Sequence, residues 1–265
     1  MWEEKEFLIC VKTYPEYSTT YTETVCTAAV LRETGRLIRL YPIPYRYLLG
    51  KHQFEKYQWV QAKIKKNPKD GRPESFKIEK DSIHPLGMVD TKNAWSVRKK
   101  LVLVPNNLFI SLEDLKNSQV EQGTSLGIIK PREIRGFHIE KKTGPEIAEE
   151  EQKKKRILSQ PDFFVEKKDL ELIPYRFLIS FTCNDTKCTT EHKISILDWE
   201  FGQLYRKVSG SDNWKEKMCQ KVEEICSPKK DVYFFMGNMA SRRQTFCILG
   251  IFYPPQVKQL SLFKS

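Results

Sequence analysis

The feature that most constrains the fold of this sequence is a series of short alternating segments in its first 78 residues. Segments rich in β-branched or alternating apolar residues recur at 6–12, 20–30, 36–41 and 57–64. Residues 67–71 (NPKDG) are turn-forming and separate the fourth segment from a hairpin partner at 76–78. Short strands joined by turns are typical of a small barrel or a strongly curved sheet. An OB-like or PUA-like N-terminal half is therefore expected, and that likeness of fold implies no function.

Proline marks the expected end of one of these strands. Pro42 and Pro44 follow the segment 36–41. Because proline has no N–H to donate to a ladder, we expect the strand to end before Pro42.

The second half of the chain contains both helical and strand periodicity of its apolar residues. Ser111 with Asp114 three residues later predicts a helix start, and apolar residues at helical spacing predict a helix over 194–208. Asp212 is the expected cap of a further helix ending at Ile225. Strands are expected at 172–182, 231–236 and 245–253.

The expected fold class is α+β, with a barrel-like N-terminal half and a mixed C-terminal half. Residues 146–151 are largely acidic and 153–156 are basic, an order that suits a solvated linker helix. The predicted divisions are a β-rich domain at 1–135, a charged linker helix at 136–165 and an α+β domain at 166–265.

Positive charge is concentrated in two blocks. The chain carries 45 Lys and Arg against 34 Asp and Glu, a formal net charge of +11. Residues 51–100 hold 13 basic and 6 acidic side chains, and residues 201–265 hold 11 and 5. Clustered cations displace the counterions of a polyanion, so nucleic acid, DNA or RNA, is the expected partner.

Aromatic residues accompany these charges, as a nucleic-acid groove requires. Bases stack on aromatic rings while Lys and Arg follow the phosphates. Lys63 and Lys65 share one face of their strand with Gln61 and Trp59. The predicted binding residues are Arg39, Tyr41, Arg46, Tyr57, Trp59, Lys63, Lys65, Lys66, Lys69, Arg72 and the hairpin-tip pair Arg242 and Arg243. Trp59 in a core and Arg242 in an ordinary solvated loop are the competing interpretations.

Two thiols and an imidazole lie close together at Cys183, Cys188 and His192. Zinc binds thiolate and imidazole tetrahedrally, so these residues predict a zinc site. No fourth ligand follows locally, and Cys219, Cys226 or Cys247 would have to complete it. The alternative is a hairpin with two reduced cysteines and a solvent-exposed histidine.

A second constellation consists of His192, Lys193, Asp198 and Glu200, which are residue types found in metal-dependent nucleases. If 194–208 is helical throughout, Asp198 and Glu200 point about 200° apart and do not converge on one ion. Catalysis at these four residues is therefore an alternative rather than the preferred interpretation.

The remaining features narrow the function classes. The sequence contains no GxGxxG, GxxxxGK[ST], GxSxG, HExxH or paired CxxC motif. Residues 1–6 lack the pattern of a secretory signal, no apolar run reaches about 20 residues, and the seven cysteines are scattered. A cytoplasmic protein with reduced thiols and no membrane partner is expected.

The sequence favours a nucleic-acid-binding accessory or targeting protein over an enzyme. Its expected setting is a larger protein complex in prokaryotic nucleic-acid processing or in defence against foreign DNA. The two alternatives are a metal-dependent nuclease and a protein-interaction subunit with an acidic partner.

Overall fold

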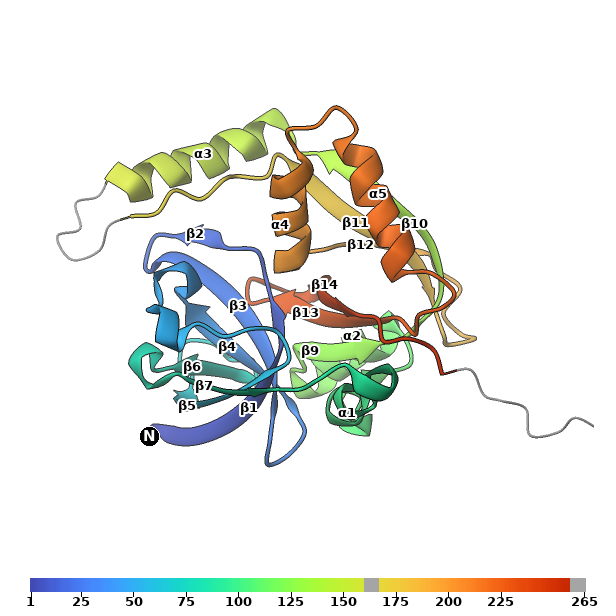
Figure 1. The fold of residues 1–265 in the computed structure, drawn as a ribbon, viewed down its shortest axis with the longest axis horizontal. Coiled ribbons are helices and arrows are strands. Elements are labelled where there is room, and N and C mark those ends of the chain that lie inside the picture. The colour runs from blue at the N-terminus through green and yellow to red at the C-terminus, as the bar shows by residue number, and fades with distance from the viewer. Residues whose placement is uncertain (160–166, 258–265) are drawn as a thin grey trace, which may run out of the picture.

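The computed structural model describes residues 1–159 and 167–257, which form a mixed α+β fold as expected (Figure 1). A five-stranded, OB-like closed barrel occupies the N-terminal half. Its strands run in the spatial order β1-β3-β4-β6-β5, and the barrel closes where β5 pairs with β1. Their bounds are β1 Glu3–Lys12, β3 Thr22–Leu31, β4 Leu37–Ile43, β5 Gln58–Lys66 and β6 Ser75–Ile78. Two strands extend this sheet, β2 Glu16–Ser18 beside β3 and β7 His84–Met88 beside β5.

The apolar run in β1 reflects burial on both faces of the barrel wall. Phe7 and Ile9 belong to the cluster inside the barrel, whereas Leu8, Cys10 and Val11 belong to a second cluster outside it. The second cluster also contains side chains from the last two strands of the chain, Phe235, Leu249 and Phe252. A strand covered on both faces reads as a continuous apolar segment, and β1 thereby joins the barrel to the C-terminal half.

The prediction that Pro42 ends its strand is wrong, because β4 continues through Pro42 to Ile43. Ile43 pairs with Val25 on β3, and the register shifts between Val25 and Thr27 at this point. An irregularity in the ladder removes the need for a regular hydrogen bond from proline.

Two smaller sheets form the C-terminal half. One is the antiparallel sheet β10 Pro131–Lys141, β11 Tyr175–Cys183 and β12 His192–Ser195. The other has the order β14-β13-β9-β8, comprising β8 Leu108–Phe109, β9 Leu126–Ile129, β13 Tyr233–Met239 and β14 Arg242–Phe252. The expected strands over 231–236 and 245–253 are therefore the hairpin β13–β14, and the expected strand over 172–182 begins only after Pro174.

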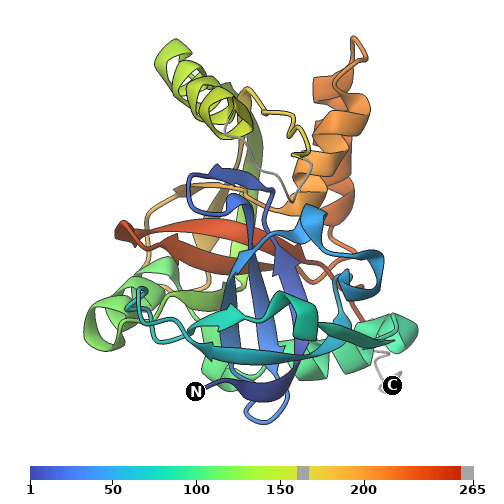
Figure 2. The same cartoon turned by 90° about the vertical axis from the view of Figure 1, so that its left-hand side faces the viewer.

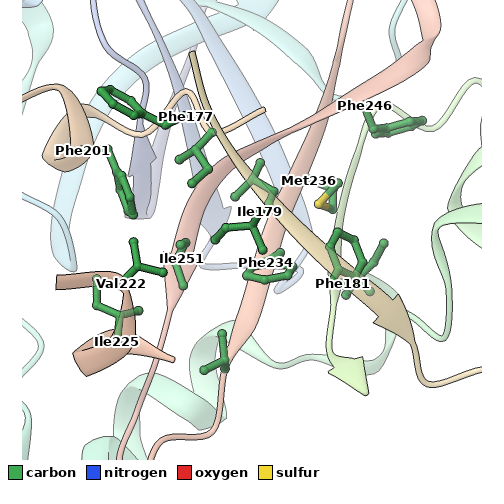
Figure 3. Packing of buried hydrophobic residues seen from close by; sticks show 14 of the residues in the cluster. Phe177, Ile179, Phe181, Phe201, Val222, Ile225, Phe234, Met236, Phe246 and Ile251 are labelled. Atoms are coloured by element: carbon green, nitrogen blue, oxygen red, sulfur yellow. The ribbon is translucent and has the colours of Figure 1, made fainter. Parts of the chain in front are cut away.

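The largest hydrophobic core packs these two sheets against helices α4 and α5. Phe181 of β11 meets Phe234 of β13 edge-on, with ring centroids 5.0 Å apart. Figure 3 shows these two rings with Ile179 and Met236 between the sheets, and Val222 and Ile225 reaching the same core from α5.

The described helices are α1 Lys92–Val102, α2 Leu112–Gln122, α3 Gly144–Ser159, α4 Trp199–Val208 and α5 Trp214–Ile225. Four short 3-10 turns accompany them, at Tyr45–Tyr47, Gly50–His52, Lys80–Ser82 and Pro105–Asn107. Ser111 caps α2 as predicted, its hydroxyl accepting from the backbone N–H of Asp114. None of the helices in the described ranges has the length and apolar character that crossing a membrane requires.

The prediction of one helix over 194–208 is wrong in its first third. Residues up to Ser195 form β12, Ile196 bridges to Ile248, and α4 begins only after Asp198, its N-cap. Strand pairing with β11 overrides the apolar period there. The N-cap position of α5 is Asn213 rather than the predicted Asp212.

The helix α3 lies within the segment predicted as a charged linker. It docks on the barrel side of the molecule, because Ile157 is buried in a cluster with Tyr17 of β2 and Leu170. Residues 160–165 of that predicted segment lie outside the described residues.

Candidate functional site

The structure brings together the two basic turns that the sequence places far apart. The guanidinium of Arg72, after the β5–β6 turn, donates to the carbonyl of Asn238 on β13 over 2.7 Å, a contact between residues 166 positions apart. The Asn238 amide in turn donates to the carbonyl of Arg243, also at 2.7 Å. A Cβ placed on Gly71 would lie 3.0 Å from the Arg243 guanidinium, so the two turns touch. Figure 2 shows the red β13–β14 turn and the teal β5–β6 turn on the same side of the molecule.

Four exposed cations surround this contact, namely Lys66, Lys69, Arg242 and Arg243, which we call the basic junction. Within residues 1–159 and 167–257, none of the four takes part in an ion pair. Lys66 approaches the Pro73 carbonyl, and its ammonium lies 4.2 Å from the Phe76 ring centroid. Among the described residues, no ion pair therefore neutralises the positive charge of the basic junction.

Asp70 fixes the shape of the β5–β6 turn. Its carboxylate accepts from Arg72 in two places, at 2.6 and 2.9 Å, and from the Ser75 hydroxyl at 2.7 Å. Burial opposes the ionisation of Asp70, but the hydrogen bonds from Arg72 and Ser75 outweigh it and lower its pKa to about 2. The charge of Arg72 is thus neutralised by Asp70 inside the turn, and the Arg72 side chain serves to position the basic junction.

The outward face of β5 carries a second part of the predicted binding surface. Lys65 lies 4.4 Å from the Trp2 ring centroid, and the Arg32 guanidinium lies 4.5 Å from that of Trp59. Lys63 pairs with Glu79 at 3.8 Å. This face combines aromatic rings and cations as expected, although its charge is partly neutralised by neighbouring carboxylates.

Three predicted binding residues, Arg39, Tyr57 and Arg72, are buried instead. Arg39 is 2% exposed, and its guanidinium donates to the Ser125 carbonyl at 2.9 Å and to the Cys26 sulfur at 3.1 Å. Arg39 and Arg72 therefore connect the barrel to the C-terminal half. Nothing in the local sequence distinguishes such an arginine from an exposed one, because its partners lie far away in the chain.

The other two predicted residues contact protein groups. Arg46 pairs with the buried Glu23 at 3.3 Å and donates to the Asp169 carbonyl at 2.7 Å. The Tyr41 hydroxyl accepts from Thr24 at 3.4 Å.

The predicted zinc ligands converge in a cluster between α2 and the β11–β12 connection. Ligand atoms of Glu113, Cys183, Cys188 and His192 all lie within 4.8 Å of one another. The Cys188 sulfur lies 3.0 Å from a Glu113 oxygen and 3.1 Å from His192 Nε2. Two sulfurs, one imidazole nitrogen and one carboxylate oxygen at this spacing fit a tetrahedral ion, so the four residues can hold a metal.

The fourth member of this cluster is not one of the predicted cysteines. Glu113 takes that place, because α2 begins at Leu112 directly beside Cys183, whose sulfur accepts from the Leu112 N–H at 3.3 Å. The alternative interpretation, in which His192 is exposed to solvent, is wrong in this respect, since His192 is 6% exposed. A glutamate in the first turn of a helix suggests only a favourable interaction with the helix dipole, so the sequence offered no signal for this role.

Burial favours the neutral form of the groups in this cluster. It raises the pKa of the Cys188 thiol to about 12 and lowers the pKa of His192. A neutral imidazole is the form that coordinates a metal, whereas a thiol must lose its proton to do so.

The four residues of the nuclease alternative do not form one site. His192 belongs to the metal cluster, and Lys193 pairs with Glu140 at 2.5 Å. Asp198 and Glu200 do converge, contrary to expectation, because Asp198 is an N-cap outside the helix. Both carboxylates contact the ammonium of Lys56, at 3.4 and 3.1 Å. Burial alone would lower the pKa of Lys56, but these two carboxylates raise it, and the lysine stays charged.

Comparisons with known proteins divide the chain near residue 106. Residues 3–104 match the family model "Domain of unknown function (DUF8758)" and residues 108–265 match "Domain of unknown function (DUF8757)". This chain belongs to the DUF8757 family. The DUF8757 match begins at β8, the first strand of the sheet that ends with β13 and β14. The predicted domain limits at 135 and 165 stay a prediction.

Other comparisons add a weak structural likeness. No curated protein matches this DUF8757 chain. Among solved structures it is similar to a chain from "Structure and Conformational Change of a Replication Protein A Heterotrimer Bound to ssDNA", with a TM-score of 0.35 and 11% identity. The match covers 97% of this chain and 50% of the other, so this chain spans half the length of the one it resembles.

Proposed function

We propose that this protein binds nucleic acid through the basic junction and the adjoining outward face of β5. The observation that carries the proposal is the contact between the two basic turns, held by the hydrogen bond from Arg72 to Asn238. It places Lys66, Lys69, Arg242 and Arg243 on one surface without neutralising partners in the described part of the chain. Four neighbouring cations suit the regularly spaced phosphates of a strand.

Aromatic rings along β5 extend this surface. Trp2 is exposed and lies beside Lys65, whereas Trp59 is half-buried against the second cluster, with the Arg32 guanidinium over its ring. An exposed ring beside a cation, as at Trp2, favours stacking with an unpaired base, and we infer a preference for single strands over duplexes.

The direct test is fluorescence anisotropy of labelled single-stranded DNA, single-stranded RNA and duplex DNA, titrated with the full chain. The triple variant Lys69→Glu, Arg242→Glu and Arg243→Glu should weaken binding by about 100-fold or more, because each cation contributes to phosphate neutralisation. The matched control is Lys207→Glu, an exposed lysine on α4. Equal losses in the triple variant and the control would refute the basic junction as the binding surface.

The same titration distinguishes nucleic acid from an acidic protein as the partner. If the cations serve an acidic protein instead, wild-type protein will bind none of the three nucleic acids at low salt. Cleavage of the labelled strands with added Mg²⁺, lost in Asp198→Ala, would instead favour the nuclease.

We also propose that the Glu113, Cys183, Cys188 and His192 cluster holds a structural zinc ion. The donor set supports zinc over magnesium or calcium, which prefer oxygen ligands alone. Elemental analysis of purified protein should find one zinc per chain, lost in Cys183→Ser and retained in Cys219→Ser, which changes a cysteine outside the cluster. Protein that lacks metal after purification and reconstitution with zinc would contradict this assignment.

The cellular setting proposed from the sequence, an accessory role in prokaryotic nucleic-acid processing or defence, follows only if the binding surface is confirmed. A pull-down with the triple variant as the control would show whether partner proteins are recruited through nucleic acid or directly.

A further inference from the structure

A cavity of about 490 Å³ lies where the barrel, α1 and the C-terminal half meet. The barrel contributes Lys12 and Tyr57, α1 contributes Trp95 and Arg98, and the C-terminal half contributes Trp199 and Tyr253. None of these residues belongs to the basic junction or the metal cluster. The volume is within the range of small-molecule sites, about 300–1,000 Å³.

One wall of this cavity is aromatic. The ring centroid of Trp95 lies 6.1 Å from that of Tyr57 and 5.6 Å from that of Tyr253. Trp199 stands on the α4 side, its ring 5.4 Å from Tyr45. These rings line the cavity, so a flat ligand that enters it meets aromatic side chains.

The backbone that carries Trp95 is strained. Asn93, Ala94 and Trp95 have φ values of 49°, 52° and 62°, in the left-handed region. The left-handed region is unfavourable for residues other than glycine, so packing must hold this turn in place. Consecutive strained residues at a cavity wall are a feature of ligand sites.

The cations of the cavity differ in how fully they are neutralised. Lys56 contacts both Asp198 and Glu200. The ammonium of Lys12 donates to the Phe54 carbonyl at 3.2 Å and lies 4.1 Å from the Tyr45 ring centroid, and within the described ranges it forms no ion pair. Burial lowers the pKa of Lys12 to about 8, against the opposing effect of Glu200 and Glu55 nearby. An anion beside Lys12 would compensate this desolvated charge.

Arg98 is a second cation of the cavity that forms no ion pair within the described ranges. Its Nε and Nη2 both donate to the Val89 carbonyl, at 2.8 and 2.6 Å, while the guanidinium carbon lies 4.2 Å from the Tyr57 ring centroid and 5.0 Å from that of Trp95. The guanidinium is thus fixed among the rings.

We propose that this cavity binds a nucleoside monophosphate, with its base against the aromatic wall and its phosphate at Lys12. The features of the cavity correspond to the base and the phosphate of such a ligand. Its rings contact a base, the Lys12 ammonium, which forms no ion pair in the described ranges, binds a phosphate, and the Glu55 carboxylate accepts from an amino group of a base. A bare phosphate would leave the aromatic wall unused, and an uncharged base would leave Lys12 without an anion.

The test is calorimetric titration of the full chain with AMP, GMP, CMP and UMP. Ribose 5-phosphate, which lacks the base, and adenosine, which lacks the phosphate, are the ligand controls. At least one monophosphate should bind at least 10-fold more tightly than both controls. Failure of all four to bind at about 10 mM, or equal binding of ribose 5-phosphate, would overturn the proposal.

Variants locate the site. Lys12→Met keeps most of the side-chain length and should weaken the best monophosphate by about 10-fold, whereas Lys12→Arg should restore most of the affinity. Trp199→Leu should also weaken it, and Lys207→Met on the surface of α4 should leave it unchanged. Thermal melting checks that each variant is folded, and if Lys12→Met is not, the Trp199→Leu result decides. Unchanged affinity in a folded variant of either residue would contradict the site.

A further arm distinguishes a free nucleotide from a nucleotide of a bound strand. If a strand supplies it, Lys12→Met will also weaken the oligonucleotide in the anisotropy assay. If the ligand is free, oligonucleotide affinity will be unchanged while the calorimetric loss remains. The basic junction is tested separately by the Lys69, Arg242 and Arg243 triple variant. A wrong assignment of the cavity and a wrong assignment of the junction would therefore give different results.

Discussion

Arginines occupy two contrasting regions of this protein, the seam between the barrel and the C-terminal half and the rim formed by the two hairpin turns. In the seam, Arg39 and Arg72 are buried and donate to distant carbonyls. At the rim, Arg242 and Arg243 are exposed and form no ion pair in the described part of the chain. One residue type therefore serves two purposes, since the buried arginines assemble the surface that the exposed ones supply with charge.

Substitutions in the seam and at the rim should have different effects. Changes in the seam should alter the free energy of unfolding, whereas changes at the rim should alter binding alone.

The largest effect on stability is expected from the Glu113, Cys183, Cys188 and His192 cluster, which connects α2 to the β11–β12 segment inside the C-terminal half. If the proposed zinc is bound, a strong chelator should lower the free energy of unfolding by about 4 kcal/mol, the value for a metal at a thousandfold its dissociation constant. Urea unfolding with and without chelator measures this. Cys183→Ser should lose the chelator effect and Cys219→Ser should keep it, and a chelator effect that persists in Cys183→Ser would place the metal elsewhere.

The second largest effect on stability is expected at Arg39 in the seam. Arg39→Ala removes a buried side chain and leaves the Ser125 carbonyl without this donor, which should cost about 3 kcal/mol. Urea unfolding compares it with Arg36→Ala, an exposed arginine next to the same strand, for which we expect a change within about 0.5 kcal/mol. Equal effects of the two substitutions would break the distinction between buried and exposed arginines.

A smaller, pH-dependent effect is expected at Asp70. Its pKa in the folded protein is about 2, below its ordinary value of 3.8, so the ionised carboxylate stabilises the fold above about pH 4. Asp70→Asn should therefore cost about 1 to 2 kcal/mol at pH 7, and the difference from wild type should disappear as the pH falls from 4 to 2.

Unfolding curves across this pH range measure the difference, with the exposed Asp81→Asn as the control. A difference that is constant with pH would show that Asp70 acts through its shape rather than its charge.

The smallest effect on stability is expected at the rim. Arg242→Gln and Arg243→Gln should each change the free energy of unfolding by less than about 0.5 kcal/mol. Each should nevertheless make the dependence of log affinity on log salt concentration shallower by about 0.7 for a single strand. Anisotropy titrations at several salt concentrations give this slope. An unchanged slope with full stability would remove these arginines from the binding surface.

The contrast between seam and rim also explains how far prediction from sequence could reach. The cluster residues Cys183, Cys188 and His192 were identifiable because they lie within ten residues, and a short segment brings them together whatever the rest of the chain does. Glu113 was not identifiable, because it reaches the cluster only through the packing of α2 against β11.

The binding surface shows the same limit. The β5 stripe of Trp59, Lys63 and Lys65 follows from the two-residue period of a strand, and the structure places all three outside the barrel. Arg39 occupies an alternating strand of the same kind, yet it is buried, because β9 and the Ser125 carbonyl cover its side of β4.

The sequence by itself determined the local elements of this protein: the strands of the barrel, the hairpin β13–β14, the cap at Ser111 and the three ligands of the cysteine–histidine loop. These depend on side-chain period and turn chemistry within a few residues. Only the tertiary structure decided that β12 is a strand, that Glu113 joins the metal cluster, and that the two basic turns meet. Each of these depends on partners remote in the chain, and burial and hydrogen bonding to such partners outweigh local preference.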